Sequence, residues 1–367
     1  MTFWQDLAKN KKPFLCLAPM EEVTDTVFRQ MVAKVAKPDV FFTEFTNVEG
    51  IVHCTSLSNP PPKLGGGCKG VVHPVLQRLC FSEAERPIVA QIWGKDPENF
   101  YEVAKLIKKL RFDGVDINMG CPVKDVVKNG CCIALINNRS LAAEIIAAVK
   151  EGAGSASRRM PVSVKTRIGL DKIITEDWCG FLLEQKLDAL TVHGRTAKEK
   201  SDVPAHWDEI AKIVRLRNRL QKVSGLRSAS ARRPSPRLPL GVAPPARSVS
   251  QPLQPFATAI VGNGDVKNAQ EAEVRSQESG VDGVMIGRGV FENMACFSAQ
   301  RKVLSAQENI DLLREHLRLW EKTWGKTKNF AIMKKFVKAY VKGWEGAGEL
   351  RAKLMEAKNV AEALVLL

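Results

Sequence analysis

Chemically reactive side chains gather in one short stretch of this 367-residue chain, "GVDINMGCPVKDVVKNGCC", which runs from Gly114 to Cys132. The apolar run Val115–Met119 stops at Gly120, and Cys121 with a proline follows at once. A cysteine in this place is a buried apolar residue, a metal ligand or a reactive thiol presented over a pocket. The stretch by itself leaves these three interpretations open, so the elements around it must decide.

Seven other short apolar runs also end in polar residues or glycines. Over all eight runs, the candidate site residues are Pro19, Met20, Glu44, Asn47, Gln91, Asn118, Cys121, Lys165, Arg167, His193, Arg195, Asn263, Asp265, Gly287 and Arg288. Burying a lysine charge without a partner is costly, so Lys165 within an apolar run indicates a functional role. A histidine alone is more often part of a core, but His193 is followed by a glycine and Arg195, which favours a place in the site. A cation there can stabilise negative charge on a bound ring.

The last two runs carry glycines in "GNGD" (262–265) and "IGRG" (286–289). Glycines allow backbone N–H groups to approach a ligand closely, and Arg288 adds a fixed positive group. Such loops indicate a phosphorylated ligand, with two ordinary glycine turns as the alternative.

The eight runs alternate with segments of helical periodicity. They are Phe14–Met20, Asp39–Phe45, Ile88–Gly94, Gly114–Gly120, Val162–Gly169, Ala189–Thr196, Ala259–Val266 and Gly283–Gly289. Short, mostly apolar strands are typical of a parallel sheet buried on both faces. Eight such units predict a (β/α)8 TIM barrel, whose active site lies at the carboxyl ends of the strands. A doubly wound sheet usually has fewer strands and a GxGxxG after the first, which this chain lacks.

Two stretches interrupt the alternation. Residues 55–74 predict a long loop between the second and third strands. Residues 221–255 contain six basic residues, no acidic one and no aromatic one, and predict a disordered basic insertion. This insertion is a flexible arm for RNA, a neutral insertion or the product of a wrongly placed gene boundary.

The chain divides, on this pattern, into a catalytic barrel of residues 1–304 and a C-terminal helical domain of residues 305–367. The C-terminal part is rich in lysine, and the whole chain carries a net charge of +15. A strongly basic balance favours a polyanionic partner, of which nucleic acid is the commonest, over a merely basic surface.

The composition also argues against several classes of protein. No apolar run has the length of a membrane helix, and the N-terminus lacks the apolar core of a secretory signal, so we expect a cytoplasmic protein. Nine scattered cysteines argue against a disulfide framework. A zinc site is a minor alternative for one group of residues, but no CxxC pair supports it and we expect no metal. That group is Cys54, Cys68 and Cys80 with His53 and His73.

The order of the motifs resembles one enzyme family. "APMEEVTD", "TEF", "VAQIWGKDP", "DINMGCPVKDVVKNG", "VSVKTRIG", "VHGRT", "IVGNGDV" and "GVMIGRG" follow one another along the chain. The chain is similar to the tRNA-dihydrouridine synthases over nearly all its length except the two interrupting stretches. This resemblance implies an FMN-dependent oxidoreductase that reduces selected uridines in tRNA, with NADPH as the electron source.

The resemblance also implies a role for each candidate. Cys121 matches the catalytic proton donor, and Asn118, Arg167 and Arg195 are expected to bind the substrate. The expected cofactor-binding residues are Pro19, Met20, Glu21, Gln91, Lys165, His193, Asn263, Gly264, Asp265, Gly287 and Arg288. The C-terminal helical domain is expected to bind tRNA, and the protein is expected to be monomeric.

The chemistry of uracil agrees with these roles. Its C5=C6 bond is conjugated to the C4 carbonyl, so hydride adds at C6 and the electrons collect toward C5, which then needs a proton. An unperturbed thiol has a pKa of about 8.5, so we expect Cys121 to be protonated at neutral pH and to act as the acid.

Two departures and two alternatives remain. Cys131 and Cys132 stand where the family has small residues, either as packing substitutes or as oxidation-prone neighbours of Cys121. The C-terminal helices carry lysine where the family often has histidine and arginine. The first alternative to a tRNA-dihydrouridine synthase is a flavin oxidoreductase acting on a free pyrimidine. The basic C-terminal domain argues against it, because a small substrate does not need one. The second alternative is a non-catalytic RNA-binding protein, and the full set of candidate residues argues against it.

Overall fold

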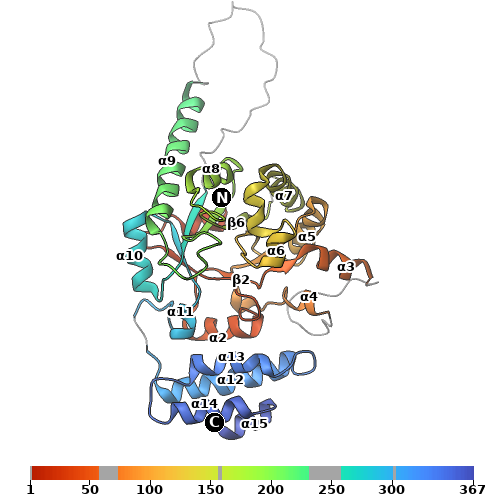
Figure 1. Cartoon of the computed structure of the whole chain (residues 1–367), viewed down its shortest axis with the longest axis vertical. Helices are drawn as coiled ribbons and strands as arrows, with labels where there is room; N and C mark the ends of the chain where they lie inside the picture. The colour runs from red at the N-terminus through yellow and green to blue at the C-terminus, as the bar shows by residue number, and fades with distance from the viewer. Residues whose placement is uncertain (1, 58–72, 156–158, 231–257, 301–302) are drawn as a thin grey trace, which may run out of the picture.

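The computed structural model describes residues 2–57, 73–155, 159–230, 258–300 and 303–367 (Figure 1). Its strands are β1 (Phe14–Leu17), β2 (Phe41–Phe42), β3 (Thr46–Asn47), β4 (Ile88–Trp93), β5 (Gly114–Met119), β6 (Val162–Arg167), β7 (Ala189–His193), β8 (Ala259–Asn263) and β9 (Gly283–Ile286). All neighbours pair in parallel in the order β1-β9-β8-β7-β6-β5-β4-β2, with β3 also on β4. The N–H of Leu17 donates to the carbonyl of Val40 at 3.1 Å and closes the ring. The predicted TIM-barrel architecture is confirmed.

The second predicted strand, Asp39–Phe45, is interrupted. Phe42 pairs with Val89, and Thr46 pairs with Ile92. The segment from Phe42 to Thr46 therefore holds one residue more than the segment of β4 that it pairs with. Such an extra residue is a β-bulge. The N–H of Gln91 donates to the hydroxyl of Thr43 at 3.0 Å in place of a backbone carbonyl. Of the expected strand only β2 forms, and β3 begins one residue after its predicted end, beyond the bulge.

Helices cover the outside of the barrel. They are α2 (Thr26–Ala36), α3 (Val48–Leu57), α4 (Pro74–Gln77), α5 (Pro97–Lys109), α6 (Lys124–Lys128), α7 (Arg139–Gly152), α8 (Thr175–Glu184), α9 (Trp207–Ser230), α10 (Ala269–Ser279) and α11 (Gly289–Glu292), with the 3-10 turns η1 (Glu83–Glu85) and η2 (Cys132–Asn137). Helix α9 runs into the predicted insertion, because residues 221–230 contain no proline and continue the helix. The start of the insertion is thus helical, and residues 231–255 lie outside the described residues, as does most of the predicted 55–74 loop.

Three buried aromatic side chains close the interior of the barrel at its amino-terminal end. The short helix α1 (Phe3–Leu7) places the ring of Trp4 5.7 Å from Phe14 and 6.2 Å from Phe42. All three side chains are buried. Gly283 on the neighbouring strand makes room for them, since a Cβ there would lie 2.3 Å from the Phe14 ring. The interior is therefore apolar at this end and open to polar chemistry at the other.

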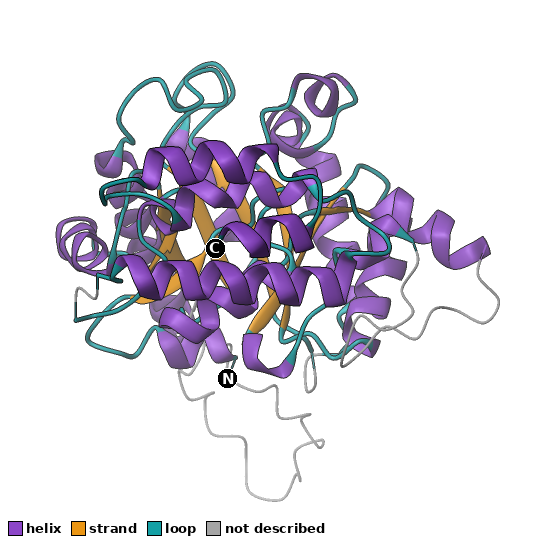
Figure 2. Cartoon of the chain, turned by 90° about the horizontal axis from the view of Figure 1, so that it is seen from below, coloured by secondary structure: helices purple, strands orange, loops and turns teal. Residues whose placement is uncertain are grey.

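Four helices follow the barrel at the C-terminus: α12 (Ala306–Trp324), α13 (Ala331–Tyr340), α14 (Ala347–Glu356) and α15 (Val360–Leu366). Seen from below in Figure 2, the helices around the C-terminus lie in front of the barrel strands. The Phe336 ring lies 5.0 Å from Phe28 and 6.4 Å from Phe291, and the buried core continues from the barrel into these helices. The predicted helical segment is present, and its status as a separate domain stays a prediction.

The described residues can be compared with the predictions that the chain has no membrane helix and binds no metal. In this part of the chain no single helix is long and apolar enough to span a membrane, and one bent pair, Lys124–Asn137 with Arg139–Gly152, reaches the threshold only across a 91° break. Within the same residues, no three His, Cys, Asp or Glu side chains are grouped to hold a metal ion. The Sγ of Cys54 lies 3.0 Å from Nδ1 of His73, while Cys68 lies outside the described residues.

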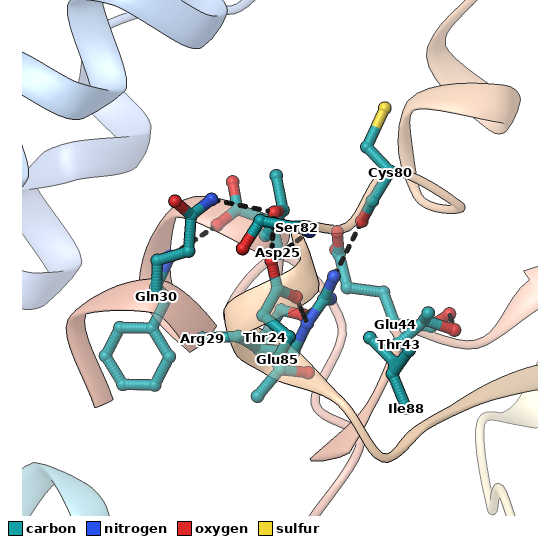
Figure 3. Close-up of polar contacts among 12 residues, drawn as sticks. Thr24, Asp25, Arg29, Gln30, Thr43, Glu44, Cys80, Ser82, Glu85 and Ile88 are labelled. Carbon is teal, nitrogen blue, oxygen red and sulfur yellow. Dashed lines mark hydrogen bonds and ion pairs between the residues drawn. The ribbon is translucent and has the colours of Figure 1, made fainter. Parts of the chain in front are cut away.

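A buried ion pair joins α2 to the segment before β4 (Figure 3). The Nε of Arg29 donates to Glu85 at 2.5 Å, and its two terminal nitrogens donate to the carbonyls of Thr24 and Cys80. The other oxygen of Glu85 accepts from the hydroxyl of Thr26 at 2.5 Å. Both charged side chains are fully buried. Because each nitrogen of the guanidinium and each oxygen of the carboxylate has a hydrogen-bond partner, this pair fixes the loop between β1 and α2 against the barrel.

We predict that Glu85→Ala destabilises the protein by about 3–5 kcal/mol, because it leaves the guanidinium of Arg29 buried without its counterion. Urea unfolding of the purified protein measures this loss. Glu83→Ala, which removes the exposed partner of Arg86, is the matched control and should leave the midpoint nearly unchanged. Equal midpoints for the two variants would show that the buried pair does not fix the loop.

Candidate active site

A cavity of about 770 Å³ opens at the carboxyl ends of the strands. Eleven of the predicted site residues line it: Pro19, Met20, Lys165, Arg167, His193, Arg195, Asn263, Gly264, Asp265, Gly287 and Arg288. These residues come from β1, β6, β7, β8 and β9 or from the loops that follow them. The parallel register brings them together, since the ends of neighbouring strands meet at one rim.

The lining of this cavity is strongly cationic. Its basic residues are Lys165, Arg167, Arg195, Lys200, Lys267 and Arg288, against the carboxylates of Asp265 and Glu292. Six cations and two anions leave an excess of positive charge in a partly enclosed space. Lys200, Lys267 and Glu292 were not predicted from the sequence, because the two lysines lie in loops beyond the strand ends and Glu292 lies at the end of α11. Such a lining attracts an anionic ligand.

Lys165 and His193 respond differently to this environment. Burial and the neighbouring Arg167 lower the pKa of Lys165 to about 8, so it still carries its charge at neutral pH. Burial, together with the surrounding cations, lowers the pKa of His193 to about 2. The Nη1 of Arg195 lies 3.2 Å from Nε2 of His193, so the guanidinium donates to a neutral ring. Of the two candidates for positive charge, Lys165 supplies it and His193 does not.

Asp265 anchors two arginines rather than facing a ligand alone. One oxygen accepts from Nη2 of Arg195 at 2.5 Å and from the N–H of Ala205 at 2.9 Å. The other accepts from Arg288 at 3.2 Å. The guanidinium of Arg195 is buried and also donates to the carbonyl of Val203. Arg195 and Asp265 therefore position His193 and Arg288, and the side chain of Arg288 stays mostly exposed at the rim.

Gly264 occupies a position that a larger residue cannot take. Its φ is +129°, and a Cβ there would lie 2.6 Å from Cβ of Ala205 and 3.2 Å from His193. Next to it, the amide of Asn263 donates to the carbonyl of Met285 at 2.8 Å. The positive φ and the close packing of Ala205 and His193 thus both require glycine at position 264. Gly287 has ordinary space around it, its Cβ position lying 3.6 Å from Ala18.

Glu21 lies apart from the cavity lining. Its carboxylate accepts from both terminal nitrogens of Arg78 at 3.0 Å, and Arg78 also donates to the carbonyl of Phe45. Its side chain thus joins the loop after β1 to the helix before β4, and a cofactor contact from Glu21 would come from its main chain. Glu44 and Asn47, the candidates of the second strand, also lie outside the lining. The carboxylate of Glu44 is buried and accepts from the N–H of Glu22 at 2.6 Å.

Gln91 and Asn118 lie on β4 and β5 inside the barrel, and Cys121 follows β5; none of the three lines the cavity, although Pro122 next to Cys121 does. The amide nitrogen of Asn118 donates to Oε1 of Gln91 at 3.1 Å, and its oxygen accepts from the N–H groups of Gly120 and Cys121. Gln91 in turn donates to the carboxylate of Asp116 at 2.7 Å. Asp116 was not predicted from the sequence, although it precedes Asn118 by two residues on the same strand and so faces the same side.

Arg167 holds the loops around Cys121. Its Nε donates to the carbonyl of Gly120 at 3.0 Å, and its Nη1 donates to the carbonyl of Thr196 at 2.9 Å. Burial is the main reason that the pKa of Arg167 falls to about 10, which leaves the side chain charged. Arg167 therefore joins the loop after β5 to the loop after β7 while it lines the cavity.

The thiol of Cys121 is more acidic than expected from the sequence. A hydrogen bond from the Cys132 thiol lowers its pKa to about 7, against burial, with help from the N–H of Val123 and the charge of Arg167. The same contact and burial raise the pKa of Cys132. Cys132 has a φ of +54°, a conformation that favours glycine. Cys131 and Cys132 pack with Cys121 in one small buried cluster, but only Cys132 stabilises its thiolate.

The whole chain is similar to known proteins. The family model described as dihydrouridine synthase matches residues 68–221 and 246–367. A probable tRNA-dihydrouridine synthase of Staphylococcus aureus (strain COL) is 39% identical over 367 residues, which is all of this chain and 94% of the relative. Probable tRNA-dihydrouridine synthase 2 of Bacillus subtilis (strain 168) is 38% identical and is covered to 95%.

We predict that Cys132→Ala raises the pKa of Cys121 from about 7 toward the ordinary thiol value of about 8.5, because the thiolate loses its main hydrogen-bond donor. The pH dependence of iodoacetamide alkylation at Cys121, followed by peptide mass spectrometry, measures the midpoint. Cys131→Ala removes a neighbouring thiol and serves as the control. An unchanged midpoint in Cys132→Ala would exclude the hydrogen bond as the cause.

Proposed function

The chain belongs to the dihydrouridine synthase family, and on this basis we propose that it reduces the C5=C6 bond of uridines in tRNA with FMN as cofactor and NADPH as reductant. The observation that carries the proposal is the cationic cavity at the carboxyl ends of the strands, with Cys121 at its edge. An excess of positive charge suits both a cofactor phosphate and an RNA substrate.

The residues of the cavity fit FMN. Gly264 lines the cavity without a side chain of its own, and the exposed guanidinium of Arg288 is held at the rim by Asp265. A phosphate is suited to this pair, since backbone N–H groups and an arginine are its usual partners. Lys165 supplies a positive charge farther inside the cavity, suited to the ring, and Pro19 and Met20 line the same space. FMN bound here would supply hydride to C6 of the uracil.

Cys121 is suited to deliver the proton to C5. Cys121 is 8% exposed and its backbone N–H is held by Asn118, so the thiol has a defined position next to Pro122, which lines the cavity. With a pKa near 7, about half of the thiol is protonated at neutral pH. The protonated form is the acid, so the rate of reduction should fall as the pH rises above 7.

Neutral His193 and charged Arg167 are the two further side chains that we expect to contact a ligand in the cavity. His193 accepts from Arg195, so its other ring nitrogen carries the proton and can donate to a ligand. Arg167, which holds the loop of Cys121, lines the cavity beside it and is placed to bind the carbonyl groups of a uracil. Asn118 contributes through the backbone of Cys121 rather than from the lining.

The C-terminal helices are suited to hold tRNA beside the cavity. Lys335 of α13 donates to the carbonyl and carboxylate of Glu22, and Lys342, two residues after α13, donates to the carbonyls of Phe291 and Glu292. These two lysines attach α13 and the segment after it to the rim. Exposed lysines remain for phosphates at positions 322, 326, 338, 353 and 358. The target uridine must leave its stack to reach the cavity, and phosphate contacts orient the tRNA for that step.

A direct assay tests this function. The purified protein should be yellow, should oxidise NADPH, and should form dihydrouridine in unmodified tRNA, with weaker binding as salt rises. A colourless protein that binds no added FMN would overturn the flavoenzyme proposal. Reduction of a free pyrimidine without reduction of tRNA would instead support a small-molecule substrate.

We predict that Cys121→Ala keeps the flavin absorption and NADPH oxidation but loses dihydrouridine formation by about 10²-fold or more, because C5 lacks its acid. Single-turnover reduction of tRNA by the pre-reduced protein isolates this step. Cys131→Ala is the matched control and should retain activity. Undiminished product formation by the Cys121 variant would rule out the proton-donor role.

A further inference from the structure

Four polar side chains form a chain of hydrogen bonds inside the barrel. Gln91, Asp116 and Ser163 are register neighbours on β4, β5 and β6, and all three are buried. Asp116 accepts from Ser163 at 2.6 Å on one oxygen and from Gln91 at 2.7 Å on the other. Gln91 then accepts from Asn118, and Asn118 accepts from the backbone of Cys121 at 3.1 Å. We call this chain of contacts the interior relay.

The two ends of the interior relay determine its direction. At one end, the carboxylate of Asp116 can only accept, so Gln91 must turn its NH₂ group toward it. At the other end, the backbone N–H of Cys121 can only donate, so Asn118 must turn its oxygen toward it. The two amides then meet as Asn118 NH₂ and Gln91 oxygen, which is the contact observed at 3.1 Å. The carboxylate of Asp116 and the N–H of Cys121 therefore require the same orientation of the Gln91 and Asn118 amides.

The ionised state of Asp116 at neutral pH agrees with this direction. Burial raises its pKa to about 6, while hydrogen bonds from Ser163 and Gln91 and the charge of Lys165 oppose that rise. At pH 7 most of the carboxyl is therefore ionised and accepts hydrogen bonds only. A buried carboxylate with donors on both oxygens is costly to replace by a group that cannot accept.

The interior relay ends on the peptide that carries Cys121. The N–H of that peptide donates to Asn118, and its carbonyl, from Gly120, accepts from Nε of Arg167 at 3.0 Å. Both polar groups of the peptide are thus held by side chains from β5 and β6. Its plane is fixed, and with it the direction in which the Cys121 side chain leaves the backbone.

We propose that Asp116 is a positioning residue, which sets the direction of the interior relay and thereby holds the thiol of Cys121 at the edge of the cavity. The importance of that thiol rests on the proposed function, whereas the relay is argued from the contacts alone. Asp116 lies in the closed interior and acts through Gln91 and Asn118.

The first test compares two substitutions of Asp116 in the holoenzyme. In Asp116→Asn, the new oxygen can accept from Gln91 while the new NH₂ donates to the hydroxyl of Ser163, so the relay keeps its direction. Asp116→Ala removes the acceptor and frees both amides. The measured quantities are the midpoint and the alkaline plateau of Cys121 alkylation by iodoacetamide against pH, with Ser163→Ala as the control.

We expect Asp116→Ala to move the midpoint up by about one pH unit toward an ordinary thiol, and to raise the plateau several-fold as the loop loosens. Asp116→Asn and Ser163→Ala should keep the profile of the unaltered protein. An unchanged profile in Asp116→Ala would overturn the proposal. A profile equally disturbed in Asp116→Asn would overturn the claim that direction, rather than charge, is what Asp116 sets.

A compensating pair keeps the proposal testable if Asp116→Ala does not fold. In Asn118→Asp, the Gln91 amide lies between two carboxylates, which can only accept hydrogen bonds. Gln91 can donate its NH₂ group to only one of them, and its oxygen then faces the other. Thermal stability should therefore fall. Adding Asp116→Asn lets residue 116 donate to the Gln91 oxygen while Ser163 donates to residue 116. The double variant should therefore be more stable than Asn118→Asp alone. Additive losses of stability would contradict the directional relay.

These readouts do not depend on catalysis. Full activity in Cys121→Ala would remove the proposed role of the thiol while leaving the alkylation and stability results intact. Failure of the relay tests would leave the tRNA activity untouched. As a functional readout, dihydrouridine formation should fall about tenfold or more in Asp116→Ala and be retained within about twofold in Asp116→Asn, following the alkylation profiles.

Discussion

Excess positive charge at the mouth of the barrel governs most of the site. Six cations against two carboxylates surround a space with limited access to water. Burial and the surrounding cations keep His193 neutral, and the hydrogen bond from Cys132 together with the charge of Arg167 favours the thiolate of Cys121. Two of these cations, Arg195 and Arg288, share the single carboxylate of Asp265. The remaining imbalance is what a phosphate-bearing cofactor and a nucleic acid would neutralise.

Much of this arrangement follows from the sequence because strand ends of a parallel barrel converge. Eleven of the predicted residues line one cavity, since each follows a recognisable apolar run. What the pattern does not reveal is which side chains face one another. Arg195 has the charge of a substrate ligand but is buried against Asp265, and Asp116 is hidden within an apolar strand because its partners lie on β4 and β6. Local pattern predicts position along the chain, whereas pairing depends on register.

The pKa of Cys121 shows the same limit. The sequence predicts the pKa of an unperturbed thiol for Cys121. The contact with Cys132 that lowers this pKa depends on a left-handed backbone at Cys132, with a φ of +54°, which local propensity disfavours. The bulge after Phe42 is also set by tertiary pairing, because β2 and β3 must both reach β4. The C-terminal helices add a further non-local contact, in which the indole of Trp324 donates to Asp25 at 2.8 Å, next to the loop after β1.

Helix α9 begins next to the loop of Arg195 and ends at Ser230, on the opposite side of the molecule from the C-terminal helices (Figure 1). The chain returns to the described structure at Thr258, directly before β8, at the amino-terminal end of that strand. Changes of length at this junction are therefore separated from the chemistry by the full height of the barrel. A change of chain length here leaves the rim of the cavity untouched, so this site is a natural place to attach a fusion partner or an affinity tag.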